Sequence, residues 1–174
     1  KTLNKYDGQK YVENVTELVP SKYLSELKEF FNSPQMLQNA SRYLGFNAEI
    51  KTFFLYANLP GVDSEQNEGS KAFHRDALCY RVYEIFFAVS SISDNNAPFF
   101  FVKNPLLQDR AEVIITNSML EGDWSTSGRL SEADLSSSIK EPLDIGKFIG
   151  EPGSAIALNT GVTYHRGGFV KDGY

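Results

Sequence analysis

Phe73–Asp76, with the sequence FHRD, is the stretch that decides the fold expected for this chain, together with Tyr164–Gly168 (YHRGG) near its end. The chain has only two histidines, His74 and His165, and each lies in one of these stretches. His74 and Asp76 are two positions apart, so on an extended strand their side chains leave the same face. A second imidazole from a later strand completes the two-histidine, one-carboxylate set that holds Fe(II) and keeps coordination positions open. The sequence therefore predicts a metal site made of His74, Asp76 and His165.

Length and composition limit the classes of protein to which the chain can belong. With 174 residues, of which 41% are hydrophobic, we expect one domain over residues 1–174. The 13 Phe and 9 Tyr favour a sheet-rich body. A net charge of −5 without a Lys/Arg cluster argues against nucleic-acid binding. The longest apolar run, Ile85–Val89, is far too short to cross a membrane.

The targeting signals and the cysteine content indicate where the protein works. Cys79 is the only cysteine, so no internal disulfide can form and a reducing compartment is the simpler assumption. No positively charged segment followed by an apolar stretch opens the chain, so we expect no signal peptide. These features together predict a cytoplasmic protein.

The segment 21–45 has the periodicity of two short helices. Ser21 is the expected N-cap of the first helix, whose apolar residues recur at helical spacing: Leu24, Leu27, Phe30 and Phe31. Ser33 is the expected N-cap of the second helix, with Pro34 in its first position. Gly45 is a natural helix stop.

The remainder of the chain favours strands. We expect strands over residues 48–56, 79–91, 99–102, 112–116 and 153–158, with turns at 58–61 and 93–98. Residues 117–141 are polar and Ser-rich, and a loop of this length is usually functional or mobile. A single helical turn is expected within it at residues 131–135. Helices followed by strands indicate an α+β fold, mainly β, dominated by an antiparallel sheet.

The order of these motifs resembles the phytanoyl-CoA dioxygenase family of Fe(II)- and 2-oxoglutarate-dependent dioxygenases. In that family an aromatic residue precedes H-x-D, as Phe73 does here. Asp94–Pro98 (DNNAP) is similar to the family turn before the next strand, with Ala97 where glycine is usual. Gly150–Leu158 is similar to the turn and small-apolar strand that lead to the distal histidine. The resemblance covers residues 47–174.

The resemblance implies a fold, an activity and a set of site residues. The implied fold is a double-stranded β-helix (jelly roll, cupin-like) over residues 47–174, with the helices at 21–45 packed outside. His74, Asp76 and His165 are the implied iron ligands and catalytic residues, and 2-oxoglutarate and O2 are the implied cosubstrates. The implied reaction hydroxylates a small organic substrate and releases succinate and CO2. Related halogenases replace the carboxylate ligand with a small residue, so the presence of Asp76 favours hydroxylation.

One part of the family pattern lies outside the sequence given. The family binds the far carboxylate of 2-oxoglutarate with an arginine on the last core strand, shortly after the distal histidine. The sequence ends at Tyr174, so we expect this arginine and this strand beyond it. Arg166 is not the expected substitute, because the side chain next to His165 on a strand points to the opposite face.

Two other functions stay open at this point. A cupin-type metalloenzyme would use the same triad without 2-oxoglutarate, and a catalytically silent jelly-roll protein would use its pocket only to bind a ligand. In the polar loop, Trp124 is either a lid aromatic or a loop anchor. Arg129 lies in the same loop and could meet an anionic substrate, although a solvated surface charge is its expected role.

Overall fold

The computed structural model describes residues 12–50, 53–60, 69–76, 82–104, 129–138 and 142–171. This part of the chain is α+β, and its named strands pair antiparallel. The helices are α1 (Ser21–Phe31), α2 (Pro34–Leu44) and α4 (Glu132–Ser138), with 3-10 turns at Thr16–Leu18 and Gly69–Lys71. The strands are β1 (Val12–Asn14), β2 (Tyr56–Asn58), β3 (Glu84–Phe87), β4 (Phe99–Val102), β5 (Ile145–Phe148), β6 (Ala155–Leu158) and β7 (His165–Gly167).

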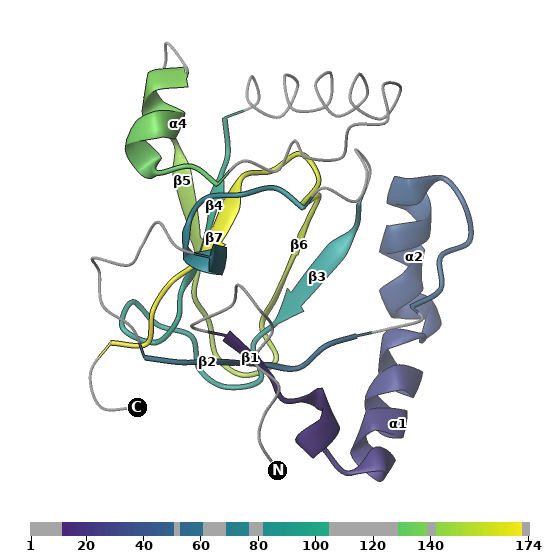
Figure 1. The fold of residues 1–174 in the computed structure, drawn as a ribbon. Coiled ribbons are helices and arrows are strands. Elements are labelled where there is room, and N and C mark those ends of the chain that lie inside the picture. The colour runs from purple at the N-terminus through teal and green to yellow at the C-terminus, as the bar shows by residue number, and fades with distance from the viewer. Residues whose placement is uncertain are drawn as a thin grey trace.

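Two sheets face each other in the body of the molecule (Figure 1). One sheet pairs β3 with β6, and the other has the order β5-β4-β7. The ring of Phe86 on β3 lies 4.5 Å from the ring of Phe99 on β4, measured between centroids, so these side chains meet between the sheets. A separate short ribbon joins β1 to β2.

Isolated backbone bridges extend the β5-β4-β7 sheet beyond β7. His74 exchanges both backbone hydrogen bonds with His165, at N···O distances of 3.0 and 2.9 Å. Phe73 exchanges both with Leu130, at 3.0 and 2.8 Å. The chain segments therefore lie in the order Leu130, residues 73–74, β7, β4 and β5.

The helices cover the outer faces of these sheets. Phe31 of α1 packs against Phe87 of β3, with ring centroids 5.1 Å apart, and Figure 1 shows α1 and α2 beside β3 and β6. On the other side of the molecule, Leu135 of α4 is buried against Phe73 and Val102. Within the described residues, no helix has the length and the apolar content to cross a membrane.

The second helix agrees with the prediction, and the first differs at its start. Ser33 is the N-cap of α2, Pro34 is its first residue, and Gly45 ends it in the left-handed conformation at φ 83°. Ser21 was expected to cap α1, but it is the first helical residue and Pro20 is the N-cap. The first turn of α1 closes on the carbonyl of Pro20, which places the helix boundary one residue earlier.

The strand predicted over residues 48–56 is wrong, because among its described residues, 48–50 and 53–56, only Tyr56 belongs to a strand, β2. Side chains from elsewhere hydrogen-bond the backbone of this stretch. The Asn32 amide bonds both backbone groups of Ile50, and Ser41 and Thr16 accept from the backbone N–H groups of Ala48 and Leu55. These groups are therefore paired without a neighbouring strand. The turn predicted at 58–61 begins inside β2, which extends to Asn58.

The other strand predictions differ from the structure mainly in their limits. Residues 99–102 form β4 as predicted. A strand was also expected over residues 79–91, but the described part of this stretch, residues 82–91, contains only the shorter strand β3, whose four residues are partly buried. Gly153 takes φ 91° in a turn, so β6 begins at Ala155. The helical turn expected at 131–135 is the longer α4. No prediction was made for β1 or β5, and residues 112–116, Cys79 and Trp124 lie outside the described residues.

The turn predicted at 93–98 is present and carries the one positive φ of a non-glycine residue in the described part of the chain. Ser93 and Asn96 pair as an isolated bridge, and Ala97 follows at φ 48°. This region of backbone space favours glycine. The position at which alanine replaces the expected glycine is therefore the strained one.

Candidate metal centre

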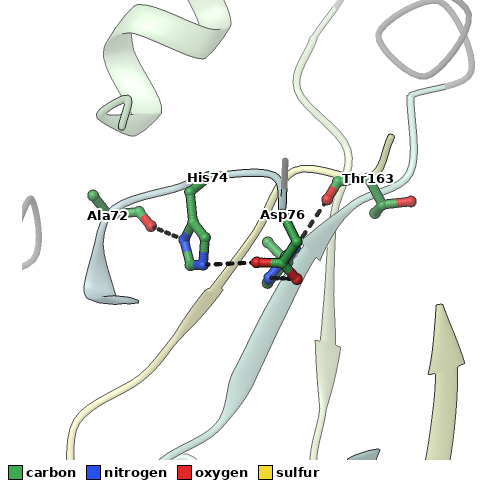
Figure 2. A network of polar contacts seen from close by, with 5 residues as sticks. Ala72, His74, Asp76 and Thr163 are labelled. Carbon is green, nitrogen blue, oxygen red and sulfur yellow. Dashed lines mark hydrogen bonds and ion pairs between the residues drawn. The ribbon is translucent and has the colours of Figure 1, made fainter. Parts of the chain in front are cut away.

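His74, Asp76 and His165 converge between the two sheets. One ligand atom from each lies within 4.8 Å of the others, and among the described residues they form the one such group of His, Cys, Asp and Glu. The Nε2 atom of His165 lies 3.6 Å from one carboxylate oxygen of Asp76, and Nε2 of His74 lies 4.0 Å from the other. Figure 2 shows His74 and Asp76 turned toward each other. The structure thus brings together all three residues that the sequence singled out.

Backbone carbonyls orient both imidazoles in the same way. Nδ1 of His74 lies 2.9 Å from the carbonyl of Ala72, and Nδ1 of His165 lies 3.0 Å from that of Thr163. A carbonyl can only accept, so each Nδ1 must carry the proton and donate it. Each Nε2 is turned toward Asp76, and in the neutral imidazole this nitrogen carries the lone pair that can bind a metal. This is how metal-binding histidines are commonly held.

The two sequence stretches form a symmetrical antiparallel pair around the centre. Because His74 pairs with His165, Phe73 lies opposite Arg166 and Arg75 lies opposite Tyr164. The Arg166 guanidinium lies 5.1 Å from the Phe73 ring centroid, and the Arg75 guanidinium lies 4.9 Å from that of Tyr164. Alternation along the strands therefore sends both imidazoles to one face and both arginines to the other. The expectation that Arg166 points away from the site is confirmed.

Aromatic side chains cover the histidine side of the centre. The ring of Phe99 stacks on His165 at 5.5 Å, and Phe86 from the facing sheet lies 6.4 Å from the same imidazole. The side chain of His165 is accordingly only 5% exposed, against 15% for His74 and 31% for Asp76. The centre is therefore closed around His165 and open on the side of His74 and Asp76.

The electrostatic environment keeps His74 neutral. Burial, the neighbouring His165 and the positive charge of Arg129 lower the pKa of His74 to about 4, against the opposing effects of the Ala72 carbonyl and Asp76. A neutral imidazole is the form that binds a metal. His74 is thus in its ligand form at neutral pH.

A second carboxyl group, which the sequence analysis did not single out, lies beside the triad. Glu84 begins β3 and projects from the same strand face as Phe86. Burial raises the pKa of Glu84, and the negative charge of Asp76 raises it further, although the Thr160 side chain opposes the change. Sequence alone offered little signal, because Glu84 lies inside an apolar run without a motif around it.

A buried lysine behind the centre was also missed. Lys71 is fully buried, and its ammonium donates to the carbonyl of Gly168 and to the side-chain oxygen of Asn58. Burial, followed by the charge of Arg166, lowers the pKa of Lys71 to about 8. Lys103, which directly follows β4, pairs with Asp144 at 3.1 Å on an exposed part of the sheet.

Comparisons with family models, with curated proteins and with solved structures give no significant match to this chain. The assignment of a function therefore depends on the residues of the centre and on their arrangement.

Proposed function

We propose that the protein is an Fe(II)- and 2-oxoglutarate-dependent dioxygenase that hydroxylates a small organic substrate and releases succinate and CO2. The observation that carries the proposal is the direction of the ligand atoms. Both Nε2 atoms face the carboxylate of Asp76, and both Nδ1 atoms lie against backbone carbonyls. Two imidazoles and one carboxylate are the donor set preferred by non-haem Fe(II) oxygenases.

The path of the chain supports a jelly roll as the finer description of the fold. Going along the sequence, residues 73–74 belong to one sheet, β3 to the other, β4 and β5 to the first, β6 to the second and β7 to the first. Two facing antiparallel sheets that exchange successive strands in this way are typical of jelly rolls, cupins included. This is also the fold implied by the resemblance to the phytanoyl-CoA dioxygenase family.

The chain's own residues have distinct tasks in this proposal. His74, Asp76 and His165 would hold Fe(II), which when bound supplies the redox chemistry for reaction of O2 with 2-oxoglutarate and the substrate. The carbonyls of Ala72 and Thr163 fix the tautomers of the two histidines. Phe99 and Phe86 keep water from the His165 side, so that reactants reach the centre from the side of Asp76.

The test is an anaerobic titration of the full-length protein with Fe(II) and then 2-oxoglutarate, followed by visible absorption. We expect the charge-transfer band of a chelated 2-oxoglutarate complex in the wild type. Asp76→Asn should lose the band, because it removes the anionic ligand. Asp94→Asn is the matched control and should keep it, because Asp94 pairs with Lys147 away from the centre.

Each result of this titration has a different meaning. Tight iron binding without the band would contradict the use of 2-oxoglutarate and favour a cupin-type metalloenzyme. Absence of iron binding in the wild type would contradict the oxygenase proposal and leave a jelly-roll binding protein as the remaining hypothesis.

A further inference from the structure

We propose that Arg129 forms a carboxylate-binding site at the open edge of the metal centre, so that this centre takes an anionic organic ligand. The inference deepens the proposed function and rests on it for the identity of the centre. It replaces the expectation that Arg129 is only a solvated surface charge. Three observations support it, namely the strand register, the anchoring of the loop and the direction from which the centre is open.

The strand register places Arg129 next to the metal ligands. Phe73 and Leu130 exchange both backbone hydrogen bonds as an antiparallel pair, so the next position along each strand puts Arg129 opposite His74. Side chains directly opposite in an antiparallel pair leave the same face of the sheet. Arg129, His74 and His165 therefore form a row across three neighbouring chain segments.

The backbone around Arg129 is fixed on its C-terminal side. Leu130 pairs with Phe73, and the next residue, Ser131, begins a reciprocal cap of α4. The Asp134 carboxylate accepts from the Ser131 N–H at 3.0 Å, while the Ser131 hydroxyl oxygen accepts from the Asp134 N–H at 3.1 Å. Leu135 then anchors the helix in the core with no exposed surface. The arginine thus projects from a held position, as a binding residue requires.

The centre is open toward Arg129 and closed at the other end of the row. Phe101 of β4 lies opposite His165 of β7. The ring of Phe101 fills the space above Gly146 of β5, so that a Cβ added at Gly146 would overlap the ring. The exposed fraction rises in the opposite direction, from 5% at His165 to 15% at His74, and Arg129 is exposed. Arg129 therefore stands at the exposed end of the row, from which a ligand can approach the centre. A guanidinium binds carboxylates in a bidentate fork, which gives orientation as well as affinity.

The experiment measures carboxylate binding by calorimetry in the Mn(II)-loaded protein, with phenylacetate as probe and phenylacetamide as its neutral counterpart. 2-Oxoglutarate is titrated in a separate arm, because the carboxylate could come from the substrate or from the cosubstrate. We expect Arg129→Gln to weaken binding of at least one of these carboxylates by about tenfold or more, and to leave phenylacetamide unchanged. Arg129→Lys should retain part of the affinity, since it keeps the charge and loses the fork.

Arg42→Gln is the matched control, because Arg42 is exposed on α2, and it should leave every affinity unchanged. A loss for phenylacetate identifies a substrate site, and a loss for 2-oxoglutarate alone identifies a cosubstrate site. Unchanged carboxylate affinity in Arg129→Gln, with Mn(II) binding intact, would overturn the inference. The phenylacetate titration is repeated without metal. Backbone pairing, and not the metal, positions Arg129, so Arg129→Gln should weaken phenylacetate binding in the metal-free protein as well. Failure of the proposed function would instead appear as absence of metal binding in the wild type.

Discussion

Removal of the Leu135 side chain is expected to destabilise the protein through the core that lies behind the candidate metal ligands. Leu135 has no exposed surface and packs with Phe73 and Val102, and Phe73 immediately precedes His74. Leu135→Ala removes three carbon atoms, whose transfer from water is worth about 2.4 kcal/mol. The cavity that remains adds to this, so we expect a loss of about 3 to 4 kcal/mol in the free energy of unfolding.

Urea unfolding followed by far-UV circular dichroism measures this loss. With an m-value of about 2 kcal/mol per molar urea, the midpoint should fall by about 1.5 to 2 M. Leu18→Ala is the matched control, because Leu18 is 57% exposed, and it should change the stability by less than about 0.5 kcal/mol. A midpoint in Leu135→Ala that equals the wild-type value would refute the reasoning. It would mean that α4, which is too short to be stable alone, unfolds separately from the sheet.

Three further predictions concern strained, crowded and buried positions. Ala97→Gly relieves a left-handed backbone at φ 48° and should raise the free energy of unfolding by about 0.5 to 1 kcal/mol in the same urea assay; a decrease would contradict the strain. Gly146→Ala brings a Cβ into the ring of Phe101, which lies opposite His165 on the neighbouring strand. It should lower the free energy of unfolding by about 1 to 3 kcal/mol and weaken Mn(II) binding. An unchanged calorimetric affinity for Mn(II) would show that the ring moves without effect on the candidate ligands. The pKa of Lys71 is lowered from 10.5 to about 8, so the cost of burying its charge is fully present below pH 8 and disappears as pH rises to 10.5. Relative to Lys71→Met, the wild type should therefore gain up to about 3 kcal/mol of stability across this range, and a flat difference would contradict the shift.

The sequence predicted those features that depend on local chemistry. The α2 helix carries its own boundaries in Ser33, Pro34 and Gly45, and the structure begins and ends it there. The strand at 99–102 is a short apolar run after a proline turn, and it forms β4 with the same limits. Convergence of the triad was predictable because H-x-D spacing fixes a common face, and only one other histidine was available to join it.

Other features depend on partners that are distant in the sequence. Residues 48–55 have the composition of a strand, yet Asn32, Ser41 and Thr16 supply the hydrogen bonds that a neighbouring strand would have supplied. The β5 strand has Gly146 at its centre, which lowers its strand propensity. That glycine is needed because the Phe101 ring occupies the space above it, a requirement that only the paired strands reveal. Local propensity is a weak guide wherever such tertiary contacts decide the conformation.

The arginines next to the two histidines explain why both stretches have the same local pattern, an aromatic residue followed by His and Arg. On paired antiparallel strands this pattern is complementary to itself, since each aromatic ring lies opposite the arginine of the other strand. Arg166 lies over Phe73 and also 4.2 Å from the Phe100 ring centroid, while Arg75 lies over Tyr164. A shift of one residue in register would place each histidine opposite an aromatic residue or an arginine and move the ligands to different faces. The contacts on the outer face therefore favour the single register in which both imidazoles reach Asp76, and the candidate metal centre depends on residues that do not face it.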